Sequence, residues 1–241
     1  MKKAIVFDLY GTLVDIHTDE TSQEFWSKFK AHLLSEGVII DNLQARYHAL
    51  VEKELKTIQH EFPDIEILKV FKALYLEGHQ TPSKKQIEHT AHVFRHLSMK
   101  HLALYPGAIS LLKTLKTAGL KVILLSNAQQ AFTNHELNVL ELRPYFDHIY
   151  LSSDYEMCKP NPLYFKSMLS DLDLKASDCI YIGNDHIADV GGAKSVGMEV
   201  IYLHTNCSQE HLPDFDCMLK VIPGDLCLVE KFLKDNVFGK S

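Results

Sequence analysis

Short runs of hydrophobic residues recur along the chain and predict buried strands. The first covers residues 4–7 (Ala-Ile-Val-Phe), and Asp8 and the turn residue Gly11 follow it. Later runs of similar length lie at 122–125, 149–151, 179–182 and 200–203. A continuous apolar run is typical of a strand that is covered on both faces, as in parallel sheets. We therefore predict that these segments pair in one buried, parallel sheet.

Helical patterns separate the predicted strands. They cover residues 109–118, 131–142, 162–172 and 190–196, and Gly119 and Gly197 end two of them. Strands that alternate with helices predict an α/β fold, because parallel strands need long crossover connections. The expected core is a Rossmann-like, doubly wound parallel sheet.

The block from about 19 to 101 breaks this alternation, because it contains four helical stretches and no convincing strand. Thr21 and Glu24 form a capping-box pattern before the first helix, and Asp41 can cap the second. Pro82 occupies the preferred first position of the fourth. A single crossover needs only one helix, so we interpret the block as an inserted all-helical cap domain.

The domain boundaries follow from this interpretation. We predict a cap domain over residues 16–102 and a core domain formed by residues 1–15 and 103–241. The aromatic residues of the first cap helix, among them Trp26, are expected to pack inside the cap.

Composition and charge exclude several classes of protein. The chain has 241 residues, of which 46% are hydrophobic and 23% charged, so it is not intrinsically disordered. The net charge is −6 and no basic stripe occurs, so no nucleic-acid partner is expected. No apolar run exceeds four residues, whereas a membrane span takes about 20.

The N-terminus and the cysteines indicate a cytoplasmic protein. Asp8 interrupts the apolar run that a signal peptide would need. The five cysteines are odd in number and include no CxxC pair, which argues against a disulfide framework or a zinc knuckle. The sequence leaves the oligomeric state open.

Polar residues follow four of the predicted strands, where the ligand crevice of an open parallel sheet lies. They are Asp8 to Thr12, Ser126-Asn127, Lys159-Pro160, and Asn184-Asp185 with Asp189. The chemistry that fits is attack by Asp8 on an electrophile, giving a covalent aspartyl intermediate that water opens.

This chemistry needs positive charge near Asp8. Asp185 and Asp189 would hold a divalent cation against Asp8, and hard oxygen ligands favour Mg²⁺. Phosphoryl transfer also needs positive charge and donors around the phosphate oxygens, which Lys159 and Ser126 could supply.

These segments resemble, in the same order, the four motifs of the haloacid dehalogenase-like (HAD) hydrolase superfamily. Asp8 to Leu13 resembles the nucleophile loop, 125–127 the second motif, Lys159-Pro160 the third, and 183–189 the fourth. The resemblance covers essentially the whole chain and implies a small helical cap that closes over the site and selects substrates.

The resemblance also implies roles for individual residues. The expected catalytic residues are Asp8 and Lys159; the expected substrate-binding residues are Thr12, Ser126, Asn127 and Lys159; the expected metal ligands are Asp8, Tyr10, Asn184, Asp185 and Asp189.

Two positions depart from the pattern of the family's phosphatases. Tyr10 stands where those enzymes usually carry a second Asp that protonates the leaving group, and losing such a group costs about 10²–10⁴ in rate. His17 or a cap residue could substitute for it, and the backbone carbonyl of Tyr10 can still bind metal. Asn184 replaces the first acid of the fourth motif, so metal affinity should fall unless Asp185 takes over.

We expect a Mg²⁺-dependent phosphatase of small phosphorylated metabolites, with two alternatives. A 2-haloacid dehalogenase uses the same Asp without metal and has an aromatic residue at the position of Tyr10. Charge balance argues against it, because Asp185 and Asp189 would stay uncompensated beside Asp8. Of the cap arginines that could bind halide, Arg46 is expected in solvent. A non-catalytic ligand-binding or interaction protein on the same scaffold is the second alternative.

Overall fold

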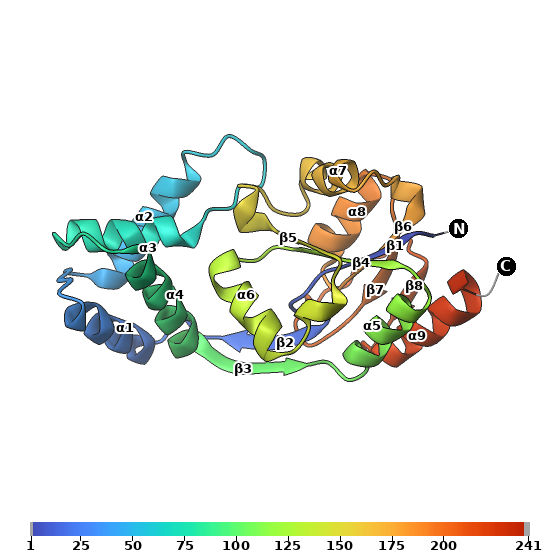
Figure 1. The fold of residues 1–241 in the computed structure, drawn as a ribbon, viewed down its shortest axis with the longest axis horizontal. Coiled ribbons are helices and arrows are strands. Elements are labelled where there is room, and N and C mark those ends of the chain that lie inside the picture. Colours follow the sequence, from blue (N-terminus) through green and yellow to red (C-terminus); the bar gives the residue numbers. More distant parts are fainter. Residues whose placement is uncertain (1, 239–241) are drawn as a thin grey trace.

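A six-stranded parallel sheet forms the centre of the larger lobe in the computed structural model, which describes residues 2–238 (Figure 1). Its strands are β1 (Ala4–Phe7), β4 (Lys121–Ser126), β5 (His148–Leu151), β6 (Cys179–Gly183), β7 (Glu199–Leu203) and β8 (Leu219–Val221). Their order across the sheet is β5-β4-β1-β6-β7-β8, so β1 lies in the middle. The five predicted strands are present, and the sequence missed only the short edge strand β8 among the six.

Helices cover both faces of the sheet. Ile5 and Phe7 of β1 pack with α5 (Ala108–Thr117), α6 (Gln130–Val139) and α9 (Leu226–Leu233). Ala4 and Val6 pack on the other face, with α7 (Pro162–Asp171) and α8 (Gly192–Ser195). Successive side chains of a strand point to opposite faces, which is why a run without polar residues is needed here. The predicted doubly wound α/β fold is confirmed.

The remaining helical turns are short. The helix expected at 190–196 begins earlier, as a π-helical segment η4 (His186–Gly191) that continues into α8. A second π-helical segment, η5 (Lys234–Phe238), follows α9. Short 3-10 turns are η1 (Arg143–Tyr145), η2 (Ser152–Asp154) and η3 (Ala176–Asp178). No helix in residues 2–238 is long and apolar enough to cross a bilayer.

Four helices form the smaller lobe, at the left of Figure 1. They are α1 (Gln23–Ser35), α2 (Leu43–Leu55), α3 (Ile67–Glu77) and α4 (Lys84–Ser98). Phe25, Phe29, Phe71 and Phe94 build a core of their own in this lobe, separate from the two sheet cores. Trp26 is 7% exposed and donates its indole N–H to the carbonyl of Glu20, so it packs in the cap interior as expected.

The cap helices begin at other residues than the sequence indicated. Ser22, not Thr21, caps α1 by accepting from the N–H of Phe25. Asn42, not Asp41, is the N-cap residue of α2, and its side chain makes no capping hydrogen bond. Ser83 and Gln86 form the capping box of α4, which leaves Pro82 before the helix. Several hydroxyl and carboxyl residues stand close together at each start, so a local pattern could not choose among them.

Two antiparallel strands connect the lobes. They are β2 (Val14–Thr18) and β3 (Met99–Leu104), which lie along the lower edge of Figure 1. Residues 16–18 and 99–102, at the two ends of the predicted cap domain, are strand and not helix. Ile16 and Leu102 pack against the main core, whereas His17 and His101 are exposed. A ribbon with one solvent-exposed face alternates polar and apolar residues, so it contains no continuous apolar run that would predict its strands.

Candidate active site

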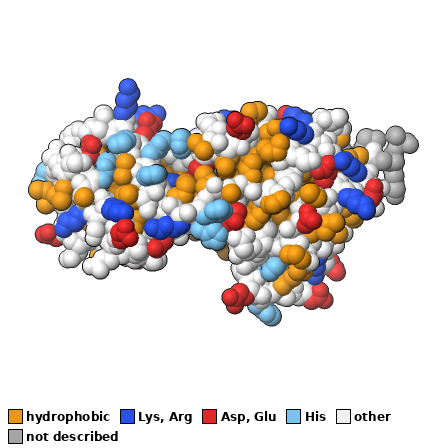
Figure 2. All heavy atoms as spheres, turned by 90° about the horizontal axis from the view of Figure 1, so that it is seen from below, with side chains coloured by type: hydrophobic (Ala, Val, Ile, Leu, Met, Phe, Trp, Pro, Cys, Tyr) orange, Lys and Arg blue, Asp and Glu red, His pale blue; other side chains and the backbone are white. Residues whose placement is uncertain are grey.

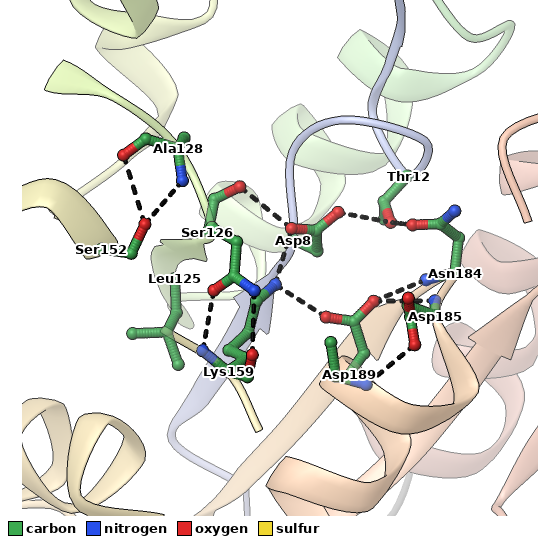
Figure 3. A network of polar contacts seen from close by, with 12 residues as sticks. Asp8, Thr12, Leu125, Ser126, Ala128, Ser152, Lys159, Asn184, Asp185 and Asp189 are labelled. Atoms are coloured by element: carbon green, nitrogen blue, oxygen red, sulfur yellow. Dashed lines mark hydrogen bonds and ion pairs between the residues drawn. The ribbon is translucent and has the colours of Figure 1, made fainter. Parts of the chain in front are cut away.

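The carboxylate of Asp8 lies where β1 ends, and three side chains hold it (Figure 3). Its Oδ1 accepts from Lys159 Nζ at 2.7 Å and from Ser126 Oγ at 3.0 Å. Its Oδ2 accepts from Thr12 Oγ1 at 3.2 Å. Asp8 is 6% exposed, so these donors replace most of its water. The structure therefore brings Asp8, Thr12, Ser126 and Lys159 together at one edge of the sheet.

Lys159 is buried between two carboxylates. Its Nζ contacts Asp189 Oδ1 at 2.7 Å, and it donates to the hydroxyl of Tyr181 at 2.8 Å. Burial by itself disfavours the ammonium, but Asp189 and Asp8 outweigh it and raise the pKa of Lys159. Burial also raises the pKa of Asp189 to about 6, although Lys159 acts in the opposite direction. Two carboxylates share one ammonium, so with both ionised the cluster has a surplus negative charge.

Asn127 positions Lys159 through its backbone. Its Oδ1 accepts from the Lys159 N–H at 2.8 Å, and its Nδ2 donates to the Lys159 carbonyl at 3.0 Å. The amide was expected to bind substrate. The structure commits both of its polar atoms to the loop that carries Lys159, although Asn127 also lines the neighbouring cavity.

The residues expected to hold metal divide into two groups. Asn184 Oδ1 accepts from the same Thr12 hydroxyl as Asp8, at 3.3 Å. Asp185 instead accepts from the N–H groups of Ile187 and Ala188, at 2.7 and 2.8 Å, and so caps η4. Only Asn184 of these two therefore shares a hydrogen-bond partner with Asp8.

Asp189 binds backbone as well as Lys159. Its Oδ2 accepts from the N–H groups of Asn184 and Asp185, both at 2.9 Å. A Cβ atom at Gly183 would lie 2.4 Å from this oxygen, so the close approach requires glycine there. Gly11 has a φ of +87° and packs against Asn184 in a similar way. The two glycines allow β1 and β6 to bring these polar side chains together.

Tyr10 is engaged in a network that the sequence did not indicate. Its hydroxyl donates to Glu136 and lies 3.0 Å from Thr133 Oγ1, both on α6. Arg95 of α4 donates to Glu136 Oε1 at 2.6 Å and thus links the cap to the core. Burial, and then Glu136, raise the pKa of Tyr10, so its phenol stays neutral. Glu136 is only 2% exposed in the structure, and nothing in the sequence distinguishes it from an exposed carboxylate of a predicted helix.

A cavity of about 510 Å³ lies between the cap and this edge of the sheet. Tyr10 and Asn127 line it from the core, and Ile16, Thr18 and Asp64 line it from the ribbon and the cap. His17 is not among the lining residues, because its neighbours in the strand face the cavity and it faces away. The sequence-based suggestion that His17 could serve as the missing acid is therefore not supported.

Asp64 is a half-buried carboxyl group of the cap that lines the cavity. It lies in the loop between α2 and α3, and accepts from Gln129 Nε2 at 3.0 Å and from the N–H of Ile65 at 2.8 Å. Ser152 also donates to it. Burial raises the pKa of Asp64 despite these hydrogen bonds. Arg46, by contrast, lies in solvent and pairs with Glu77.

Comparisons with known proteins found a matching family model and several relatives. A family model described as haloacid dehalogenase-like hydrolase matches residues 2–197. Glyceraldehyde 3-phosphate phosphatase of Pyrococcus furiosus is 26% identical over 200 residues, which cover 83% of this chain and 80% of that protein. (S)-2-haloacid dehalogenase 4A of Burkholderia cepacia is 24% identical over 204 residues, covering 84% and 83% of the two chains. The relatives therefore include enzymes of both chemistries.

Solved structures share the fold. The crystal structure of a 2-haloacid dehalogenase from Pseudomonas syringae pv. Tomato superposes with a TM-score of 0.68 at 19% identity. The match covers 98% of this chain and 99% of that one, so both lobes have counterparts. At this identity the likeness extends to the fold and not to the substrate.

Proposed function

Because the chain belongs to the haloacid dehalogenase-like hydrolase family, we propose that it hydrolyses small phosphorylated metabolites, with Asp8 as the nucleophile. The observation that carries this proposal is the setting of Asp8. Its carboxylate lies at the end of the central strand, and an ammonium and two hydroxyl groups are aimed at it. These donors can serve the oxygens of a phosphoryl group that approaches Asp8.

The proposed reaction has two steps. An oxygen of Asp8 attacks phosphorus, a new P–O bond forms, and the bond to the leaving oxygen breaks. The leaving oxygen takes up a proton. Water then attacks the aspartyl phosphate, releases inorganic phosphate and restores the carboxylate of Asp8. Lys159 and Ser126 offset the charge that spreads over the phosphoryl oxygens in both steps.

The donor set around Asp8 fits Mg²⁺. Asp8 Oδ2 and Asn184 Oδ1 approach one hydroxyl group, and the cluster with Lys159 and Asp189 has surplus negative charge. In our proposal Asp8, the Tyr10 carbonyl and Asn184 bind the ion directly. Asp185 and Asp189 hold the backbone of that segment. When bound, Mg²⁺ would neutralise part of the charge on the phosphoryl oxygens.

The leaving group needs a proton donor other than Tyr10, whose hydroxyl is committed to Glu136. We assign this role to Asp64. Its carboxyl group lines the cavity, and burial raises its pKa above that of a free aspartate. A general acid works best when its pKa is close to the working pH.

Haloacid dehalogenation is the second candidate, and the aromatic Tyr10 in the nucleophile loop is the feature that favours it. Displacing halide from carbon requires a cationic site for the departing anion. Among the described residues that line the cavity, Arg95 is the only lysine or arginine, and Glu136 already neutralises it. This argues for the phosphatase.

One set of assays separates the candidates. Hydrolysis of an aryl phosphate is measured with and without Mg²⁺, beside halide release from a 2-haloacid. Mg²⁺-dependent release of phosphate supports our proposal, and metal-independent halide release supports the dehalogenase. Inactivity of the purified, folded chain in both assays, extended to a panel of small phosphate esters, would indicate a ligand-binding protein instead. Aryl phosphates have good leaving groups, so they reduce the need for the acid.

A further inference from the structure

A second group of possible metal ligands lies on the linker ribbon, outside the cavity next to Asp8. Asp15 and His17 belong to β2, and Cys207 lies in the loop after β7. His17 Nε2 is 3.1 Å from Asp15 Oδ1, and Cys207 Sγ is 3.9 Å from the same oxygen. One ligand atom from each residue lies within 4.8 Å of the others. Two regions far apart in the sequence thus bring an imidazole, a carboxylate and a thiol together.

The spacing of these atoms suits a tetrahedral ion. Ligands at about 2.0–2.3 Å from a tetrahedral metal lie about 3.3–3.8 Å from one another. Two of the three separations, 3.1 and 3.9 Å, are close to that range, and the third is at most 4.8 Å. A mixed nitrogen, oxygen and sulfur set selects zinc-like ions over Mg²⁺, which prefers oxygen alone.

We propose that Asp15, His17 and Cys207 form a binding site for a divalent ion of the zinc class. His101 is a candidate for the fourth ligand. It pairs with His17 across the β2–β3 ribbon, and its Nε2 lies 3.4 Å from Asp15 Oδ2. Because about half of the His101 side chain is exposed, it can turn toward the ion without disturbing the core.

Asn206 supports this assignment, because its side chain contacts two of the proposed ligands. Its Nδ2 contacts Asp15 Oδ1 at 3.0 Å and His17 Nε2 at 3.1 Å. The ligand atoms of Asp15 and His17 therefore already converge on one polar hydrogen-bond donor. Tyr105 donates to Asn206 Oδ1 at 2.5 Å and lies 3.6 Å from Cys207 Sγ, so it helps to hold the loop. An ion would replace the Asn206 amide among these ligands.

The proposed site lies between a linker strand and the core domain. β2 connects the core to the cap, and residues 204–208 belong to the core. An ion bound by both would fasten one of the two linker strands to the core. The site is independent of the reaction proposed for Asp8, so a failure of one does not affect the other.

The test measures metal binding by the untagged, reduced chain. Zn²⁺ affinity is determined by competition with a chromogenic chelator, and Co²⁺ is used as a spectroscopic probe of sulfur ligation. We expect one tight Zn²⁺ site, a thiolate-to-cobalt charge-transfer band, and a higher melting temperature with Zn²⁺. Cys207→Ser and His17→Ala should each weaken binding by about tenfold or more, and Cys207→Ser should remove the band.

Matched controls address other sites. Cys227→Ser removes another exposed cysteine and should leave the band and the affinity unchanged. Histidine side chains gather on the face of the molecule shown in Figure 2. The rings of two further histidines, His92 and His135, lie 5.4 Å apart. The double variant His92→Ala, His135→Ala should keep the cobalt band. Absence of the band in the wild type, or equal Zn²⁺ affinity in wild type and Cys207→Ser, would overturn the proposal.

Discussion

Two ionic clusters of this chain differ in charge balance: one has a surplus of negative charge, and the other is neutral. In the first, Lys159 lies between Asp8 and Asp189, so two acids share one base. In the second, Arg95 pairs with Glu136 alone, and the neutral phenol of Tyr10 completes the set. A surplus of buried negative charge is costly and is retained where a cation or a reacting group uses it. A balanced pair between the lobes needs no further partner. The charge surplus of the first cluster therefore predicts a role in binding or reaction. The balanced second cluster predicts a role in positioning the cap on the core.

The replacement Asp8→Asn should have the largest effect on the first cluster. An amide is not a nucleophile, so turnover should fall by about 10⁴-fold or more. The fold should persist, because asparagine has the same shape and removes negative charge from the cluster. Steady-state hydrolysis of an aryl phosphate, with circular dichroism as the control for folding, measures both. Undiminished turnover by the folded variant would refute the assignment of Asp8 as nucleophile.

Lys159→Met tests the surplus of charge itself. Asp8 and Asp189 would then face each other without a base, which should destabilise the fold by about 3–5 kcal/mol and lower turnover about 10²–10³-fold. Urea unfolding gives the first quantity and steady-state kinetics the second. The matched control is Lys69→Met, which breaks an exposed pair with Glu156 and should leave the unfolding midpoint close to that of the wild type. Equal losses of stability in Lys159→Met and Lys69→Met would contradict this account of the first cluster.

Arg95→Met tests the balanced cluster. Glu136 would keep its hydrogen bond from Tyr10 but lose its countercharge, so we expect a loss of about 1–3 kcal/mol. Replacing both partners, with Arg95→Met and Glu136→Leu together, should recover part of this loss, because the buried charge is removed as well. A double-mutant cycle by urea unfolding measures the coupling. Strictly additive losses would show that the two residues act separately.

Among these variants, Asn184→Asp should have the smallest effect. It adds to the surplus negative charge of the first cluster. An added carboxylate beside Asp8 should lower the Mg²⁺ concentration for half-maximal activity by about tenfold. The control is Asp185→Asn, whose carboxylate caps η4 and should change this concentration less. A Mg²⁺ titration of phosphatase activity compares the three proteins. An unchanged or higher requirement in Asn184→Asp would remove this residue from the metal site.

The sheet and the first cluster were accessible from the sequence, because both follow from local patterns. Unbroken apolar runs predict strands with two covered faces, and the polar residue after each run lies at the same edge of a parallel sheet. These patterns predict that Asp8, Ser126 and Lys159 lie close together, and in the structure Ser126 and Lys159 both contact Asp8. Their chemical roles are still predictions.

The second cluster and the ribbon were not accessible in this way. Tyr10 and Glu136 are 126 positions apart, and Arg95 comes from the other lobe, so no spacing in the sequence relates them. The ribbon alternates exposed His17 with half-buried Ile16, and it lacks the continuous apolar run that predicts the core strands. Contacts between lobes depend on how the lobes dock, which helical and strand periodicity do not encode.

The turn after β1 joins the nucleophile directly to the linker strand. The N–H groups of Leu13 and Val14 both donate to the carbonyl of Leu9, at 2.9 Å, and Gly11 donates to the carbonyl of Val14 at 2.8 Å. Residues 8–18 therefore form one hydrogen-bonded unit that ends in the ribbon. A chimera carrying the cap of another protein should keep this unit intact and exchange only the helices between Thr18 and Met99, because a junction closer to Asp8 would cut through the turn that aims it.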